Sequence, residues 1–221
     1  MPELTTTNSS AYVSILGVIL AGGNAKRMGG GDKGLAELGG QPMLAHVITR
    51  LRPQVGHIIL SANGDPSRFK NFNIDVVADL DTLDRGPIAG LVAAMTWIEH
   101  NRLPFDAIAT VSTDVPFLPF DCVERLHAAR SEVDDPTRPA IAVSAQRRHP
   151  TVALWPLSLK PKIAAALARN DLRVNRLADS LDAIEVGFPF SDYGGELIDP
   201  FFNANTPDDL AVARNLLTRQ P

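Results

Sequence analysis

Two kinds of apolar pattern alternate along the chain. Short runs of consecutive apolar residues are typical of buried strands, and apolar residues at every third or fourth position are typical of helices that pack on a sheet. The runs predict strands at 12–20, 57–62, 74–78, 107–112, 140–144 and 152–155. The periodic segments predict helices at 42–51, 87–98, 123–130 and about 163–168. This alternation predicts an α/β fold of three layers, with a mostly parallel sheet and helices on both faces.

The start of the last helix is marked by its residue types. Thr206 is a good N-cap, Pro207 suits the first helical position, and Asp208 and Asp209 favour the positive end of the helix dipole. We expect residues 1–10 to form a flexible tail and residues 11–221 to form a single domain, because the length suits one large domain better than two small ones.

Composition and charge exclude several function classes. Hydrophobic residues make up 45 % of the chain and charged residues 21 %, which indicates a folded globular protein. The net charge of −4 argues against a broad nucleic-acid or anionic-membrane surface. The longest nearly apolar run, about 15–23, is too short to span a bilayer. The single Cys122 is expected to be buried, and the start of the chain lacks a signal-peptide pattern, so the cytoplasm is the predicted location.

The segment 20–34, LAGGNAKRMGGGDKG, carries most of the chemical information. Five glycines between positions 22 and 31 allow the backbone to approach a ligand, and Arg27 and Lys33 add positive charge. The segment does not match a Rossmann fingerprint, because its Gly-x-Gly-x-x-Gly begins nine residues after the strand. It lacks the Gly-Lys-Ser/Thr of a P-loop. The pattern predicts a loop that binds phosphate groups.

Asp114 follows the strand predicted at 107–112. Ligands of open α/β sheets bind outside the carboxyl ends of the strands, and one or two carboxylates together with substrate phosphates commonly hold Mg²⁺. Asp79 has the same strand-end position, and Asn63 follows another strand. From residue type alone, Asp79 is as likely to be a turn residue as a ligand, whereas a ligand role is favoured for Asp114 over a turn or capping role. Asn63 could contact a base or ribose with its amide or form an Asx turn before Gly64.

Five motifs together resemble the molybdenum cofactor guanylyltransferases of the MobA type. They are LAGG with RMGG and DK in 20–33, GPIAG at 86–90, TDVPF at 113–117, HPT at 149–151 and NANTP at 203–207. The resemblance covers about residues 15–215, and LAGG in place of LAAG resembles the guanylyl branch. It implies a Rossmann-like fold of the nucleotide-diphospho-sugar transferase type, with a nucleotide-binding half at about 11–120 and an acceptor-binding half at about 121–221. It also implies Mg²⁺-dependent transfer of GMP from GTP to molybdenum-molybdopterin.

The resemblance assigns roles to residues at matching positions. The catalytic residues that it implies are Arg27, Lys33 and Asp114, and Asp114 is also the implied Mg²⁺ ligand. The implied nucleotide-binding residues are Leu20, Ala21, Gly22, Gly23, Lys33, Ser61, Asn63, Asp79, Gly86, Pro87 and Asp114. The implied acceptor-binding residues are Arg147, His149, Arg173, Asn175, Asn203 and Asn205. The family often has Asn where this chain has Ser61, which leaves the base contact there open. From residue type alone, a solvated basic turn is the default interpretation of Arg147 to His149.

Two other functions stay open at this point. The chain could transfer a different nucleotide, either CMP to the molybdenum cofactor or a nucleotide to a sugar phosphate. It could also be a GTP-binding adaptor that handles the cofactor without chemistry. Proteins that deliver molybdopterin or receive the product are candidate partners, whereas nucleic acid and membranes are not. The oligomeric state is open, with a monomer slightly favoured.

Overall fold

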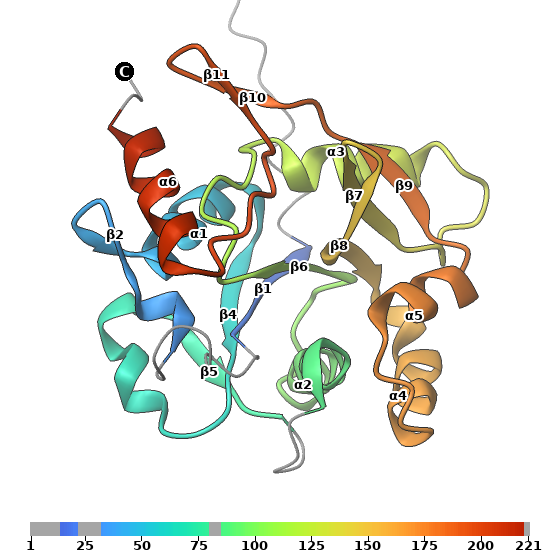
Figure 1. Ribbon diagram of the computed structural model, residues 1–221. Helices are drawn as coiled ribbons and strands as arrows, with labels where there is room; N and C mark the ends of the chain where they lie inside the picture. Colours follow the sequence, from blue (N-terminus) through green and yellow to red (C-terminus); the bar gives the residue numbers. More distant parts are fainter. Residues whose placement is uncertain (1–13, 22–31, 80–84, 219–221) are drawn as a thin grey trace, which may run out of the picture.

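The computed structural model describes residues 14–21, 32–79 and 85–218, so the expected tail at 1–10 lies outside the described residues. A seven-stranded sheet crosses the molecule in the order β5-β4-β1-β6-β8-β7-β9 (Figure 1). Its strands are β1 (Ile15–Leu20), β4 (His57–Ser61), β5 (Asp75–Val77), β6 (Ala107–Ser112), β7 (Ala140–Ser144), β8 (Arg147–Pro156) and β9 (Ile184–Gly187). β5, β4, β1 and β6 pair in parallel, as do β7 and β9, and only β8 runs against its neighbours.

Helices cover both faces of this sheet. The helices are α1 (Met43–Leu51), α2 (Gly86–His100), α3 (Cys122–Ser131), α4 (Lys160–Ala168), α5 (Val174–Ser180) and α6 (Pro207–Leu217). Alternate residues of β1 face opposite sides: Ile15 and Ile19 pack with α1 and α3, whereas Leu16 and Val18 pack with α2, α4 and α5. These two apolar layers confirm the predicted three-layer α/β fold with a mostly parallel sheet.

A smaller apolar cluster attaches the end of the chain. α6 packs through Leu210, Ala213 and Leu216 against residues of two short hairpins. One hairpin pairs β2 (Glu37–Leu38) with β3 (Gln41–Pro42), and the other pairs β10 (Ser191–Tyr193) with β11 (Glu196–Ile198). Short 3₁₀ helices fill the remaining connections, at η2 (Lys33–Leu35), η3 (Arg52–Gln54), η4 (Pro66–Phe72) and η5 (Leu157–Leu159). This packing brings α6 close to the segment that begins at Lys33.

The predicted helices and strands agree with the structure where the apolar segments are long and continuous. The strands at 107–112 and 140–144 coincide with β6 and β7, and Thr206 caps α6 in a full capping box with Asp209. β8 is longer than predicted, because it begins at Arg147 rather than 152. The sequence reasoning missed α5, β9 and both hairpins, which are short or half-exposed.

Cys122 is buried, as predicted. Burial raises the pKa of its thiol, so the group stays protonated and packs as a small apolar side chain. None of the helices in the described part of the chain has both the length and the apolar character needed to cross a bilayer.

Candidate active site

The carboxyl ends of the four parallel strands meet at one edge of the sheet. Backbone hydrogen bonds continue past the strands there: Ala21 N donates to Ser61 O at 2.9 Å, Ala62 N to Val77 O at 3.0 Å, and Thr113 N to Leu20 O at 3.3 Å. The segments that follow β1, β4, β5 and β6 are therefore held side by side. This is the edge at which open α/β sheets bind ligands.

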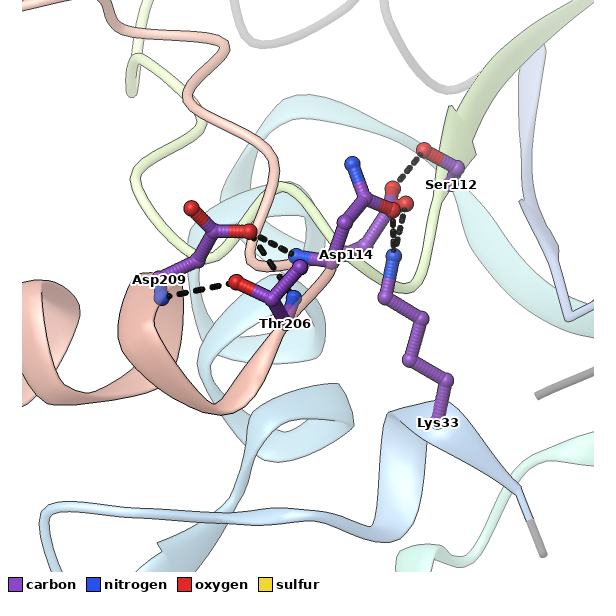
Figure 2. Close-up of polar contacts among 6 residues, drawn as sticks. Lys33, Ser112, Asp114, Thr206 and Asp209 are labelled. Atoms are coloured by element: carbon purple, nitrogen blue, oxygen red, sulfur yellow. Dashed lines mark hydrogen bonds and ion pairs between the residues drawn. The ribbon is translucent and has the colours of Figure 1, made fainter. Parts of the chain in front are cut away.

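Lys33 and Asp114 form an ion pair at this edge, as Figure 2 shows. The ammonium Nζ of Lys33 lies 2.5 Å from Asp114 Oδ2, and the two side chains are only 17 % and 18 % exposed. The other carboxylate oxygen, Oδ1, accepts a hydrogen bond from the hydroxyl of Ser112 at the end of β6. Both oxygens of Asp114 are thus held, and the carboxylate has a fixed orientation at the end of the strand.

The segment before α6 contributes a third residue to this group. Lys33 Nζ also donates to Asn205 Oδ1, and the backbone N–H of Ala204 donates to Asp114 O at 3.1 Å. Asn205 is fixed in turn, because its N–H donates to Asp209 Oδ2 at 2.9 Å within the capping box of α6. Two of the three ammonium donors of Lys33 therefore have side-chain partners from distant parts of the chain.

Hydrogen bonding also sets the charge state of the capping residue. Burial favours the neutral form of the Asp209 carboxyl, but hydrogen bonds from Thr206 and Asn205 outweigh it and place its pKa below the ordinary value. Asp209 is therefore a carboxylate at neutral pH, and it stabilises the positive start of α6 as well as the position of Asn205.

Gly34 allows the helical turn of Lys33 to lie against the end of β6. A Cβ at position 34 would lie 3.1 Å from both Cβ and Cγ2 of Thr113, the residue before Asp114. We expect Gly34→Ala to lower the free energy of unfolding by about 1–2 kcal/mol, because the β-branched Thr113 has little freedom to move away. Urea unfolding measures the change. Gly187→Ala is the matched control, since a Cβ there meets no atom within 4 Å, and an equal loss in that variant would contradict the explanation.

A cleft lies beside the Lys33–Asp114 pair, at the ends of β1, β4 and β5. The space between its lining atoms, together with the solvent at its open mouth, amounts to about 320 Å³. Its lining residues are Leu20, Ser61, Ala62, Asn63, Asp79, Gly86, Pro87 and Gly90. Six of the residues expected to bind the nucleotide therefore line one cleft, although they come from four separate parts of the sequence.

Two glycines shape this cleft at the start of α2. Gly86 has a φ of +64°, a left-handed conformation that favours glycine, and Pro87 follows it in the first turn. At Gly90 a Cβ would lie 2.7 Å from Ser61 Oγ and 2.8 Å from Leu20 Cδ2. A glycine at this position therefore lets α2 approach the ends of β1 and β4, and it sets the width of the cleft.

The donor set fits a divalent cation that is shared with a ligand. Asp114 supplies a carboxylate, and the Asn205 amide and the Ser112 hydroxyl add neutral oxygens next to it. Within residues 14–21, 32–79 and 85–218, no group of three or more His, Cys, Asp or Glu side chains could hold a metal ion by itself. An arrangement with one carboxylate suits Mg²⁺, which usually completes its shell with water and substrate phosphates.

The residues expected to bind the acceptor have different surroundings. Since β8 is antiparallel, its first residues lie at the same sheet edge as Asp114. Arg147 is exposed there, whereas His149 is buried against Phe201, with ring centroids 4.7 Å apart. His149 Nε2 lies 2.7 Å from Ser144 Oγ, and that hydroxyl donates to Asp199 Oδ1 at 2.7 Å. Burial lowers the pKa of His149, so the imidazole is neutral at neutral pH.

The remaining acceptor-side residues divide between two places. Asn203 is half-buried and stands two residues before Asn205, beside the Lys33–Asp114 pair. Arg173 and Asn175 are exposed at the start of α5. The hydrogen bonds and ion pairs of the described residues do not join either of these two side chains to Asp114 or Lys33.

Three of the expected site residues, Gly22, Gly23 and Arg27, lie outside the described residues. Of the other expected residues, Leu20 is buried and Ala21 is half-buried at the end of β1. Sequence reasoning missed Ser112 and Arg68. The Arg68 guanidinium pairs with Asp32 at 3.0 Å and donates to the carbonyl of Asn63, so it connects the residue before Lys33 with the cleft. No sequence signal marks Arg68, whereas Ser112 stands two residues before Asp114 at the end of a predicted strand.

Comparisons with known proteins place the chain in a family of nucleotidyltransferases. Residues 17–184 match the family described as MobA-like NTP transferase domain. The chain is 44 % identical to the molybdenum cofactor guanylyltransferase of Rhodopseudomonas palustris, over 92 % of each chain. It is also 44 % identical to that of Nitrobacter hamburgensis, over 90 % of this chain and 93 % of the relative.

A solved structure shares the fold. It is the crystal structure of molybdopterin-guanine dinucleotide biosynthesis protein A from Archaeoglobus fulgidus, which aligns with a TM-score of 0.69 at 19 % identity. The alignment covers 93 % of this chain and all of that one. With the family match over most of its length and relatives at this level of identity, the chain belongs to the MobA-like NTP transferases, within them to the molybdenum cofactor guanylyltransferases.

Proposed function

We propose that this protein transfers GMP from GTP to the terminal phosphate of molybdenum-molybdopterin and releases pyrophosphate. In this reaction an oxygen of the acceptor phosphate attacks the α-phosphorus of GTP, and the bond from that phosphorus to the bridging oxygen breaks. The acceptor phosphate has a second pKa of about 6, so it is largely a dianion at neutral pH. The reaction therefore needs no general base, and catalysis consists of positioning and neutralising charge.

The observation that carries this proposal is the Lys33–Asp114 pair beside the cleft. A lysine ammonium and a carboxylate 2.5 Å apart, next to a cleft lined by Ser61, Asn63 and Asp79, combine groups for phosphates and for a hard cation. Asp114 would hold Mg²⁺ together with the phosphates of GTP, and the metal would neutralise their charge. Lys33 would then bind the leaving pyrophosphate, with Arg27 as a second cation.

The acceptor is proposed to bind on the other side of Asp114. Arg147 at the start of β8, and Asn203 and Asn205 before α6, lie at the same sheet edge as Asp114. The buried His149 would support this side of the site without touching the acceptor. It bonds to Ser144, and Ser144 donates to Asp199, so the two bonds connect β7 and β8 to the segment that leads to Asn203. Contacts from Arg173 and Asn175, the division into two halves near residue 120, and a cytoplasmic location stay predictions.

The experiment that tests the proposal measures pyrophosphate release with and without molybdenum-molybdopterin. We expect release to require the acceptor, GTP and Mg²⁺ together, and to be much slower with CTP, ATP or UTP. Release without preference for GTP, or with a preference for CTP, would make the protein a different nucleotidyltransferase. GTP binding without any release would favour an adaptor.

A simpler measurement can precede that assay. Thermal unfolding with Mg²⁺ and each nucleotide in turn should show the largest stabilisation with GTP. A ligand at about 100 times its dissociation constant adds about 2.7 kcal/mol to the stability of the native state, which a melting curve resolves easily. Equal stabilisation by all four nucleotides would contradict selection of the guanine base.

A further inference from the structure

Asn63 and Asp79 form a closed pair at the mouth of the cleft. Asn63 Nδ2 donates to Asp79 Oδ2 at 2.8 Å, and Asn63 Oδ1 accepts from the backbone N–H of Asp79 at 2.9 Å. The two residues follow β4 and β5, whose ends are joined by the bond from Ala62 N to Val77 O. Both line the cleft beside Ser61 and Gly90.

The two bonds use both ends of the Asn63 amide. Its oxygen and one of its N–H groups are directed at the same residue, so rotation of the amide away from Asp79 would break both bonds. The main chain of Asn63 is held as well, because Arg68 donates to its carbonyl. Asn63 is therefore placed to fix the Asp79 carboxylate rather than to turn its own amide toward a base.

We propose that Asn63 is a positioning residue that holds the carboxylate of Asp79 in the orientation that recognises guanine. The inference rests on the proposed function, in which Asp79 contacts the guanosine part of GTP. Guanine presents two neighbouring N–H donors on one edge, at N1 and N2. Adenine and cytosine present an unprotonated ring nitrogen beside their amino group, and a carboxylate repels that lone pair. A carboxylate with a fixed orientation therefore favours guanine, and one that is held less firmly favours it less.

The chemistry of the pair argues for this role over a purely structural one. Asn63 is exposed and Asp79 is half-exposed, so water can replace the hydrogen bond between them and neither group is left buried and unsatisfied when the other is removed. The pair lies within the cleft lining, where a fixed carboxylate affects ligand choice directly. Loss of Asn63 should consequently change nucleotide preference more than stability.

A double-mutant cycle tests the proposal. Dissociation constants for Mg²⁺-GTP and Mg²⁺-ATP are measured for the wild type, Asn63→Ala, Asp79→Asn and the double variant. We expect Asn63→Ala to lower the preference for GTP over ATP by about tenfold, the scale of weakening a hydrogen bond to a charged group. The double variant should lose no more preference than Asp79→Asn alone, because Asn63 acts through Asp79.

The control is Asn101→Ala. Asn101 is also exposed and its Nδ2 donates to Trp97 O at 2.8 Å, but it caps the far end of α2. This variant should keep the wild-type preference. Thermal unfolding without nucleotide checks that all the variants fold.

Three outcomes would overturn the inference, and they can be told apart. If the losses of the two single variants multiply in the double variant, Asn63 reads the base by itself. If Asn63→Ala keeps the wild-type preference, the pair is only structural. In both cases a wild type selective for GTP leaves the proposed function standing. A wild-type protein that prefers another nucleotide would contradict both the proposed function and the guanine contact.

Discussion

Replacing Asp114 by asparagine is expected to lower the turnover number by about two orders of magnitude or more while the protein stays folded. Asparagine keeps the shape of the side chain and an oxygen that can accept from Ser112 or Lys33, but it removes the negative charge. The carboxylate is what a hard cation needs at this position, and losing one electrostatic group that acts in the transition state commonly costs a factor of about 100–1,000. Steady-state pyrophosphate release at saturating GTP, Mg²⁺ and molybdenum-molybdopterin measures the loss.

A matched control separates this effect from a general loss of an ion pair. Asp75→Asn makes the same change in an exposed carboxylate that pairs with His57 at 2.9 Å. Asp75 lies on β5, the outermost strand, and its partner His57 begins β4, whereas Asp114 follows the end of β6, with β4 and β1 between β5 and β6. The Asp75→Asn variant should keep the wild-type turnover number. An Asp114→Asn protein that retains most of its turnover in excess Mg²⁺ would exclude Asp114 from the mechanism.

Much of the fold can be predicted from the sequence because its central strands are continuous apolar runs. β6 and β7 are buried on both faces, so nearly every position is apolar and polar residues mark their ends. β9 at the sheet edge has half-exposed and exposed positions in alternation, and α5 has only seven residues. Neither leaves a pattern long enough to distinguish it from a loop.

The site can be predicted as a set of residue types but not as a set of contacts. Lys33 and Asp114 were recognisable from their motifs, yet their contact joins residues 81 positions apart, and Lys33 and Asn205 are 172 apart. Asn205 was expected to bind the acceptor, and the structure adds a contact with Lys33 that no sequence pattern encodes. In the same way Asn63 was a candidate to read the base, and the structure shows its amide engaged by Asp79.

The alternation of side chains along β8 explains why neighbouring residues of the basic segment 147–149 have different surroundings. The basic segment 147–149 could have been a solvated turn, but β8 already begins at Arg147. Side chains alternate along a strand, so His149 faces the interior beside Phe201, whereas Arg148 faces outward and pairs with Asp179 and Glu185. The hydrogen bonds that Arg148 donates to these two carboxylates raise its pKa, and they join β8 to α5 and β9.

Removing Lys33 is expected to change phosphate binding and metal binding in opposite directions. In Lys33→Met the side chain keeps its length but loses its charge, so the affinity for Mg²⁺-GTP should fall by about 10–100-fold, the equivalent of about 1.5–3 kcal/mol for a charged hydrogen bond. The affinity for guanosine should not change, because the nucleoside cleft does not include Lys33. Calorimetric titration of both ligands gives the two values.

In the protein without nucleotide, removing Lys33 is expected to strengthen metal binding. There the Lys33 ammonium lies 2.5 Å from Asp114 Oδ2 and is the counter-ion of that carboxylate. A divalent ion must displace it, at a cost that the phosphates of GTP can offset by binding the released ammonium. Without nucleotide, Lys33→Met should therefore bind Mn²⁺ more tightly than the wild type, by at least about tenfold, as electron paramagnetic resonance of free Mn²⁺ would show.

Lys160→Met serves as the control for both measurements. Lys160 also pairs with a carboxylate, Glu99, and its side chain is 19 % exposed, close to the value for Lys33, but it lies on α4. It should leave the affinities for GTP, guanosine and Mn²⁺ unchanged. Equal losses for GTP and guanosine in Lys33→Met would contradict a phosphate role for Lys33. Unchanged Mn²⁺ binding would show that the lysine does not compete with metal for Asp114, and this competition would then give the metal and GTP no reason to bind together.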